Sequence, residues 1–345
     1  MKEGIITVLS TVLVFGVLIF IHEFGHFITA RLCGVGVKEF AIGMGPKLFS
    51  WKSKKYDTVY GVRALPIGGF VSMVGEDDES SEQNAFCNKS VWKRMLIVLA
   101  GPAMNIALGF LLMTIIVSFQ PTLASATVSG FAEGAMSNEK LQVGDTVVIV
   151  DGTPVITGND VVYEIMNKGY RPIDIFVIRE GKLVKLEDVT FPSFEESGVK
   201  FGDYDFSVAP EGKNPLTVIK HSVGRSFSTI KMTLDSVAGL ISGRFGLDSV
   251  SGPVGVAGVV GDAVKLGFFN FLYIVVVLSV NLGVFNLIPF PALDGGRLLF
   301  LIIEWVRGKP IKKEVESYIN FVGIILLFAL MVLIMGKDVI NLIRR

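Results

Sequence analysis

Charged residues are scarce in this sequence, and neither sign is in excess. They make up 19% of the 345 residues, with 32 Lys and Arg against 32 Asp and Glu, so the formal net charge is zero. Soluble domains average about 25% charged residues. Without a basic excess the chain has no positive field to hold phosphates, which argues against nucleic acid as a partner.

Cysteine and histidine are also rare. The two cysteines, Cys33 and Cys87, do not form a Cys-x-x-Cys pair, so neither a disulfide framework nor a cysteine-based metal site is indicated. We expect both to be free thiols in a reducing compartment. The chain has only three histidines, which leaves few candidates for any chemistry that uses imidazole.

Apolar residues make up 51% of the chain, and many are gathered into four long runs. The runs cover about residues 5–28, 95–119, 268–288 and 319–335. Crossing ~30 Å of hydrocarbon takes roughly 20 helical residues. The first run lacks a strongly basic start, so we interpret it as a retained span and not as a signal peptide. The sequence therefore predicts a polytopic α-helical membrane protein with four transmembrane helices.

The distribution of Lys and Arg predicts the orientation of these spans. The loop after the first span is rich in both, from Arg31 to Arg94, and the loop between the last two spans carries several more. Positive charge stays on the cytoplasmic side. Both loops are therefore expected in the cytoplasm, with the termini and the section between the second and third spans outside. Arg344 and Arg345 argue the other way.

The sections between the spans differ in character. Residues 37–73 alternate apolar and polar side chains between glycine turns, which is typical of a β-hairpin. Residues 122–214 read as a small α+β domain, with strands at 146–150 and 173–178. Residues 215–267 contain an amphipathic linker helix and a Gly-rich segment. The chain is thus divided into 1–121, 122–214, 215–267 and 268–345, the first and last parts forming the membrane core.

The first span contains His22-Glu23-Phe24-Gly25-His26. Histidines at i and i+4 share one helical face, so both can reach one zinc ion, and the glutamate between them can accept a proton from metal-bound water. Ionisable residues within a span are costly and are rarely kept without a function. The alternative is a pair of interfacial histidines beside a glutamate at a helix end.

A catalytic zinc ion usually has three protein ligands, so the two histidines need a third. His221 lies far along the chain with no ligand-type residue at metal-site spacing, and we assign it no metal role. The segment 286–296 breaks the third span with Pro289 and Pro291 and then supplies Asp294. We expect His22, His26 and Asp294 to hold one Zn²⁺ per chain. The alternative role for Asp294 is an N-cap of the helix that starts at Gly295.

Four motifs in this order resemble those of the site-2 proteases, the M50-type intramembrane zinc metalloproteases, and in particular the bacterial RseP type. They are His-Glu-Phe-Gly-His, Ala-Gly-Pro-Ala-Met-Asn at 100–105, Ser-Gly-Pro at 251–253 and the 286–296 segment that ends in Leu-Asp-Gly-Gly. The resemblance implies a membrane-reentrant hairpin at 37–73 and one PDZ-like extracytoplasmic domain at 122–214, of which 141–152 is the most recognisable part. It also implies a bacterial inner (cytoplasmic) membrane protein with its active site toward the cytoplasm.

By this resemblance the substrates are single-span membrane proteins, such as anti-sigma factors already trimmed by another protease, or signal-peptide remnants. Glu23 is expected to be the general base, and a strand edge of the 37–73 hairpin to hold the unwound substrate by strand addition. The candidate substrate-binding residues are Asn286, Asn105, Pro289 and Pro291. The alternative is an inactive membrane metal-binding scaffold of the same fold. A transporter is disfavoured because no inverted repeat relates the two halves.

Overall fold

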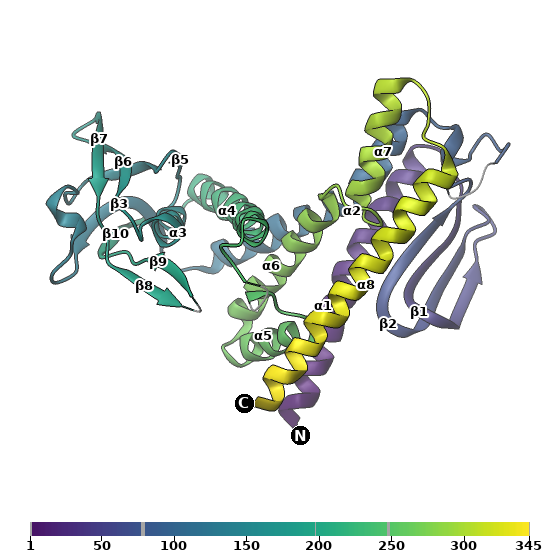
Figure 1. Ribbon diagram of the computed structural model, residues 1–345, viewed down its shortest axis with the longest axis horizontal. Coiled ribbons are helices and arrows are strands. Elements are labelled where there is room, and N and C mark those ends of the chain that lie inside the picture. Colours follow the sequence, from purple (N-terminus) through teal and green to yellow (C-terminus); the bar gives the residue numbers. More distant parts are fainter. Residues whose placement is uncertain (1, 77–79, 197, 247–248, 345) are drawn as a thin grey trace. The chain divides into compact units, whose positions relative to one another are not determined.

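The computed structural model describes residues 2–76, 80–196, 198–246 and 249–344 (Figure 1). The chain forms two compact units. Unit 1 combines Met1–Gly109 with Val250–Arg345, and unit 2 is Phe110–Ser249. Unit 1 holds most of the apolar helices and the hairpin, whereas unit 2 holds the larger sheet.

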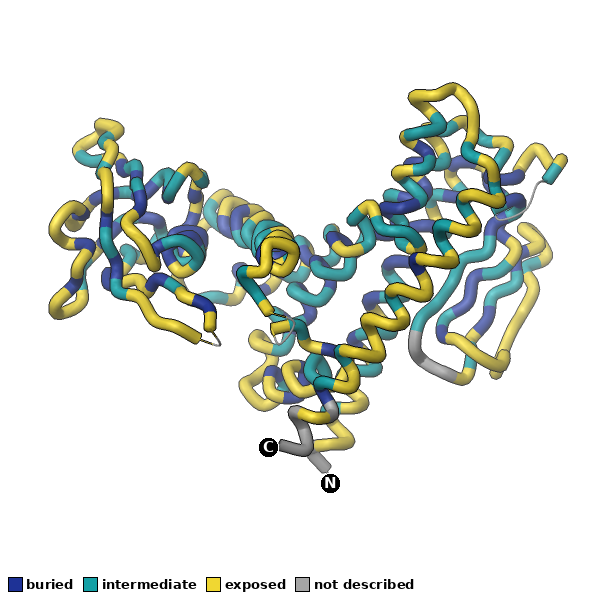
Figure 2. The backbone as a smooth tube through the Cα atoms, viewed as in Figure 1, coloured by how far each residue is buried: buried dark blue, intermediate teal, exposed yellow. Residues whose placement is uncertain are grey.

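In the described part of the chain four helices are long and apolar enough to span a membrane, which confirms the four expected spans. They are α1 (Lys2–Leu32), α2 (Val91–Phe119), α6 (Phe268–Leu287) and α8 (Lys313–Arg344). Only 11% of the apolar window of α1 and 6% of that of α8 is buried within the protein. Figure 2 shows α8 largely exposed along its length. Apolar helices with so little protein around them fit a lipid environment.

The hairpin of unit 1 consists of β1 (Val37–Lys52) and β2 (Val59–Met73), which pair antiparallel. Its base is buried at Val37, Phe40 and Ala41, where Phe40 stacks near Phe27 of α1 with ring centroids 5.0 Å apart. The far part of β1 exposes apolar side chains instead, namely Leu48, Phe49 and Trp51. Residues 39–42 of β1 pair with 69–72 of β2 on one side and with 59–62 on the other, so the hairpin is folded back on itself and Phe49 and Trp51 lie on its outer segment.

The base of the hairpin belongs to a core that also involves α1, α2 and α7 (Asp294–Arg307). A 3₁₀ turn, Phe86–Asn88, leads from the hairpin into α2. The members of this core are Ala30, Cys33, Val35, Val37, Met73, Phe86, Met95, Ile97, Val98 and Leu301. This packing fixes the cytoplasmic ends expected for α1 and α2 against α7, where the candidate site lies.

Helix α5 (Pro253–Lys265) begins without a side-chain cap of its own. Asp338 of α8 supplies one, because its carboxylate accepts a hydrogen bond of 2.9 Å from the backbone N–H of Gly255. The N–H groups of a first helical turn lack intrahelical partners, so a carboxylate there is favourable. Asp338 is buried and thus connects α8 to α5 within unit 1.

Unit 2 contains a sheet in the order β10-β3-β4-β6-β7, with β5 paired to β4. The strands are β3 (Leu123–Phe131), β4 (Thr146–Val150), β5 (Thr153–Pro154), β6 (Ile173–Arg179), β7 (Lys182–Val189) and β10 (Phe206–Glu211). A separate pair, β8 (Ser193–Glu196) and β9 (Val199–Gly202), precedes β10, and a 3₁₀ turn, Ser137–Glu139, lies between β3 and β4. Val128, Leu141, Ile165 and Ile175 are among its fully buried side chains.

Two helices with strong start signals complete unit 2. Helix α3 (Gly158–Lys168) begins with a capping box between Thr157 and Asp160, and α4 (Pro215–Ile241) begins with one between Asn214 and Thr217. Such boxes satisfy the backbone donors of the first turn. Helix α4 lies within 215–267, where the sequence predicted an amphipathic helix.

Helix α4 is joined to α3 by partly buried polar contacts. The hydroxyl of Tyr163 donates to Asp235 at 2.8 Å, and Lys231 bridges Asp235 at 2.6 Å and Glu164 at 2.8 Å. Burial and the Asp235 carboxylate both raise the pKa of Tyr163, so this hydroxyl stays protonated. Helix α4 is therefore an integral part of unit 2 and not a free linker.

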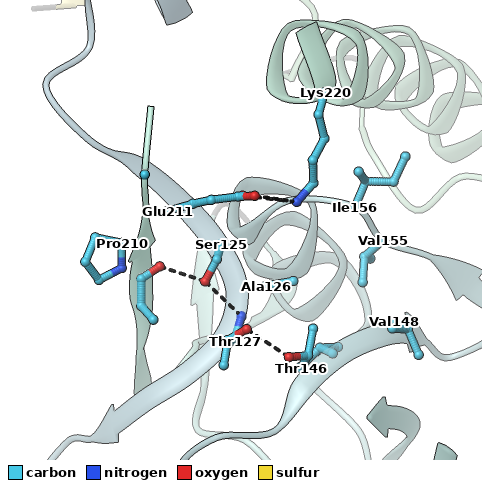
Figure 3. A pocket seen from close by; sticks show the side chains of 13 residues that line it. Ser125, Ala126, Thr127, Thr146, Val148, Val155, Ile156, Pro210, Glu211 and Lys220 are labelled. Carbon is cyan, nitrogen blue, oxygen red and sulfur yellow. Dashed lines mark hydrogen bonds and ion pairs between the residues drawn. The ribbon is translucent and has the colours of Figure 1, made fainter. Parts of the chain in front are cut away.

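Figure 3 shows a pocket that is lined by residues of β3, β4 and β10. Its volume is about 480 Å³. The two strands share one pair of residues in their ladder, Thr127 and Thr146, whose hydroxyls lie 2.8 Å apart. Glu211 borders this pocket and pairs with Lys220 at 3.0 Å and with His221 at 2.7 Å. His221 is buried and hydrogen-bonded to Glu211.

Candidate metal centre

Three potential ligand atoms meet inside unit 1. Nε2 of His22 and Nε2 of His26, both on α1, lie 3.3 Å apart. Oδ2 of Asp294, at the start of α7, lies 3.1 Å from the first nitrogen and 3.3 Å from the second. Within the described part of the chain this is the one group of three or more such side chains close enough to share a metal ion.

The spacing of these three atoms suits zinc. A tetrahedral ion with ligands at about 2.0–2.1 Å places neighbouring ligand atoms about 3.3–3.4 Å apart. Oδ2 of Asp294 is buried, and among the described residues it has no hydrogen-bond partner of suitable direction, although two imidazole nitrogens are near. A cation between the three atoms would satisfy it. The side chains present therefore fit a bound zinc ion.

Asp294 reaches this place because the chain between α6 and α7 is broken and tightly folded. Helix α6 ends at Leu287, Ile288 is extended, and Ala292 has a φ of 71°. A β-carbon at Gly295 would lie 2.1 Å from the carbonyl oxygen of Ile288, and one at Gly296 would lie 2.4 Å from that of Phe290. The two glycines after Asp294 thus let the first turn of α7 lie directly on the broken segment.

The capping role considered for Asp294 is not what the structure shows. The N-cap of α7 is Leu293, the helix begins at Asp294 itself, and no side chain provides a cap hydrogen bond. The carboxylate points toward the two histidines. The N-cap alternative is therefore wrong.

Helix α2 lies against the histidines with little space between the helices. A β-carbon at Gly101 would lie 2.3 Å from Nε2 of His26, and one at Gly25 would lie 2.4 Å from the carbonyl oxygen of Ala100. Nδ1 of His26 is 2.8 Å from the carbonyl oxygen of Ile97. A carbonyl only accepts, so this Nδ1 carries the proton and Nε2 keeps the lone pair that a metal requires.

A cavity of about 310 Å³ opens beside the three ligand atoms. Strand β2 forms one wall through Phe70, Val71 and Met73. A β-carbon at Gly69, also on β2, would lie 3.2 Å from Cγ of Glu23, so the strand passes close to that glutamate. The cavity is lined by His22, Glu23, His26, Phe70, Val71, Met73, Glu76, Val98, Asn286, Ala292, Asp294 and Arg297.

The four candidate substrate-binding residues occupy different environments. Asn286 lines the cavity, and its amide donates to the carbonyl oxygen of Leu282 at 2.9 Å. Pro289 is exposed, and Pro291 packs against Gly323 of α8; neither lines the cavity. Asn105 is fully buried behind His22 and does not line it. Of the four, the structure brings only Asn286 to the wall beside the metal ligands.

Two residues at this site were not recognised from the sequence. Glu76 forms an ion pair with Arg297 of α7 and also accepts a hydrogen bond of 3.1 Å from the N–H of Met73, at the end of β2. Both charged residues line the cavity and also a second, larger one of about 900 Å³. Arg297 follows Asp294 by one helical turn, which was an available signal, whereas nothing in the local sequence marks Glu76.

A family model described as Peptidase family M50 matches residues 10–330. A protein of Clostridium acetobutylicum is 36% identical over 338 residues, covering 96% of this chain and 97% of that protein. The regulator of sigma-W protease RasP of Bacillus subtilis is 30% identical over 424 residues, covering 96% and 98%. The zinc metalloprotease RasP of Bacillus licheniformis is 30% identical over 420 residues, with the same coverage.

Proposed function

This chain belongs to peptidase family M50, the site-2 protease family, and on that premise we propose that it is a zinc metalloprotease that hydrolyses single-span membrane proteins at the bilayer. His22, His26 and Asp294 would hold one Zn²⁺ per chain. The observation that carries this proposal is the triangle of three ligand atoms, with sides of 3.1, 3.3 and 3.3 Å, beside a cavity that Glu23 borders.

Three protein ligands leave one position of a tetrahedral zinc ion for water or substrate. When bound, zinc lowers the pKa of its water toward 7 and polarises the substrate carbonyl. Glu23 is not needed for ligation, and its place beside both histidines suits a group that accepts a proton from the attacking water and later delivers it to the leaving amine. These roles separate proton transfer, carried by Glu23, from ligation, carried by the other three side chains.

The wall formed by β2 supports a mode of substrate binding. A transmembrane helix hides its peptide groups in its own hydrogen bonds, so the segment to be cut must first become extended. Residues 39–42 of β1 pair with 69–72 of β2 on one side and with 59–62 on the other, so among the described pairings the 69–73 part of β2 lies at an edge of the sheet that can pair with an extended segment. We propose that β2 holds the substrate and that the amide of Asn286, on the same cavity, binds a freed peptide group.

The proposed setting is a multi-pass protein of a bacterial inner membrane, with the active site toward the cytoplasm. Two features support it. The short loops next to the site are rich in Lys and Arg, and the outer part of β1 exposes Leu48, Phe49 and Trp51, which suits a hairpin that reenters the membrane. We further propose that residues 122–214 form a PDZ-like domain outside.

The proposed substrate class is narrower than the family assignment. The Bacillus subtilis relative is named a regulator of sigma-W protease, which supports single-span anti-sigma factors as substrates, alongside remnant signal peptides. An inactive metal-binding scaffold would share the ligands but would have no use for Glu23.

The proposal is tested with the purified full-length chain in detergent and a tagged single-span substrate. We expect about one zinc per chain in wild type and in Glu23→Gln, cleavage by wild type only, and loss of that cleavage in a chelator with recovery on adding zinc. Zinc bound at one per chain with no cleavage of any single-span substrate would favour the scaffold. Cleavage by Glu23→Gln at the wild-type rate would remove Glu23 from the mechanism.

A further inference from the structure

Asn105 is a buried polar residue in the middle of an apolar helix, and the proposed hydrolysis gives it no role. Its side chain has no solvent exposure. One polar atom, Nδ2, lies 3.4 Å from Nδ1 of His22. The other, Oδ1, is buried and has no hydrogen-bond partner among the described residues. An unpaired buried amide oxygen costs about 1–3 kcal/mol, so this arrangement needs an explanation.

The position of the proton on the His22 imidazole explains this arrangement of Asn105. A neutral imidazole carries its proton on one nitrogen and a lone pair on the other. If Nδ2 of Asn105 donates to Nδ1 of His22, the proton must sit on Nε2, the atom that faces Asp294 and His26, and that atom then cannot bind a metal. If Nδ1 carries the proton instead, it needs an acceptor. A half-turn of the amide exchanges its oxygen and nitrogen and brings Oδ1 to that place.

The neighbouring histidine already has this arrangement. Nδ1 of His26 faces the carbonyl oxygen of Ile97 at 2.8 Å, which keeps its Nε2 free for a ligand bond. Ile97 and Asn105 lie on the same helix, two turns apart, and α2 runs antiparallel to α1, so each meets one histidine. With the amide oxygen toward His22, α2 places one oxygen acceptor behind each of the two histidines.

The backbone of Asn105 is held firmly enough for such a role. Its carbonyl oxygen accepts a hydrogen bond of 2.7 Å from the hydroxyl of Ser279 on α6. Pro102 lies one turn before Asn105 on α2, and a β-carbon at Gly283 of α6 would lie 2.8 Å from the carbonyl oxygen of Pro102. Asn105 is therefore enclosed between α1 and α6, on the side of His22 away from the cavity, where a substrate has no access.

We infer that Asn105 is a positioning residue whose side-chain oxygen accepts a hydrogen bond from Nδ1–H of His22 and so fixes the tautomer that presents Nε2 to the metal. This rests on the proposed function, and it replaces the earlier expectation that Asn105 binds substrate. Groups behind metal-bound histidines typically change metal affinity 10- to 100-fold when removed.

Two variants of nearly equal size test the inference. Asn105→Leu removes the acceptor, whereas Asn105→Asp keeps an oxygen in its place. We expect Asn105→Leu to weaken zinc binding about 10- to 100-fold in chelator competition and to change the visible spectrum of the Co²⁺-loaded protein. Asn105→Asp should stay within about threefold of wild type. Thr114→Val, which alters another polar side chain of α2 whose hydroxyl donates to the carbonyl oxygen of Phe110, should bind zinc as wild type does.

A second measurement needs no loss-of-function variant. The chain has only three histidines, so ¹⁵N spectra of histidine-labelled protein can be assigned with His221→Gln. In the zinc-free wild type we expect His22 to carry its proton on Nδ1; a proton on Nε2 would overturn the inference. Wild-type zinc affinity in Asn105→Leu, or equal losses in the Leu and Asp variants, would also overturn it. Failure of the proposed function is a different result, namely a wild type that binds no zinc or does not cleave.

Discussion

Gly101 lies directly against the imidazole of His26, so closely that a β-carbon on Gly101 would be 2.3 Å from Nε2. The ligand nitrogen is therefore placed by the absence of a side chain on the neighbouring helix. A β-carbon at Gly25, on the facing helix, would lie 2.4 Å from the carbonyl oxygen of Ala100, so the backbones of α1 and α2 are also in close contact there.

Gly101→Ala should consequently disable the site without removing a ligand. The added methyl group must displace the His26 ring or separate α1 from α2, and such overpacking costs about 1–3 kcal/mol. We expect zinc content well below one per chain and no cleavage, measured by metal analysis and substrate assay. Gly130→Ala is the matched control, because a β-carbon there meets no atom within 4 Å. Normal zinc content in Gly101→Ala would show that the helices adapt freely.

Asp294→Ala tests the third ligand. Removing the carboxylate should lower zinc affinity by at least tenfold and abolish cleavage, because two histidines alone hold zinc weakly. Chelator competition gives the affinity, and Asp262→Ala is the control, since Asp262 is exposed and pairs only with Lys265 in the described interactions. Unchanged affinity would mean that the third ligand lies elsewhere.

Arg297→Met tests the ion pair at the cavity wall. Glu76 holds the end of β2 through Met73 and pairs with Arg297 on the helix that begins with Asp294. Loss of the pair should let β2 move relative to α7, so we expect KM for the substrate to rise several-fold while zinc affinity stays near wild type. The exchanged pair Glu76→Arg with Arg297→Glu should recover part of the loss. A fall in zinc affinity without a change in KM would mean that Arg297 positions the metal ligands and not the wall that binds the substrate.

The orientation in the membrane is tested by thiol labelling. Cys87 is partly accessible, whereas Cys33 is buried and would resist reagents from either side. In intact cells Cys87 should resist a membrane-impermeant reagent, and a cysteine at Ser193, which is exposed on β8, should react. Ser137 is unsuitable for this purpose because it is buried against Asp205. Reaction of Cys87 with protection at position 193 would invert the proposed topology.

Replacing residues 122–212 by a flexible linker tests the role of the proposed PDZ-like domain. We expect this domain to act as a bulky gate that keeps untrimmed substrates from the site. Helix α4 is joined to α3 by the Tyr163, Lys231 and Asp235 contacts, so the unit acts as one body. The linker variant should keep about one zinc per chain and should cleave untrimmed substrate, which wild type does not cleave. A tail receptor predicts the reverse, with cleavage of trimmed substrate falling sharply. Loss of both activities with normal zinc would exclude the gate.

Secondary-structure elements that are marked by local patterns of apolar residues could be predicted from the sequence. The apolar runs predicted the four helices, and alternation predicted the hairpin that extends from Val37 to Met73. The last helix is longer than its apolar run, starting at Lys313, because charged residues can continue a helix outside the apolar stretch. The motif at 22–26 and the carboxylate at 294 could be singled out because each is chemically unusual in an apolar setting.

Contacts between helices could not be read in the same way. The carbonyl oxygen of Ile97 behind His26 is a backbone group that any residue could supply. Asn105 was expected at the substrate because amides bind peptide groups, but its side chain lies against His22 in the close contact between α1 and α2. Glu76 acquires its place only when the end of β2 meets α7. Such relations depend on packing over long sequence distances, which local patterns do not encode.

The proposed ligands come from nearly opposite ends of the chain, since about 270 residues separate His22 from Asp294. At ~5–20 residues per second, a ribosome needs roughly 14–54 s to make the second ligand after the first. During that interval the first spans are already in the membrane, close to other newly inserted proteins, and they hold two histidines and Glu23 without the carboxylate. A half-made chain of this kind cannot assemble the three-ligand centre, so synthesis itself delays the appearance of proteolysis until the rest of the enzyme has been built.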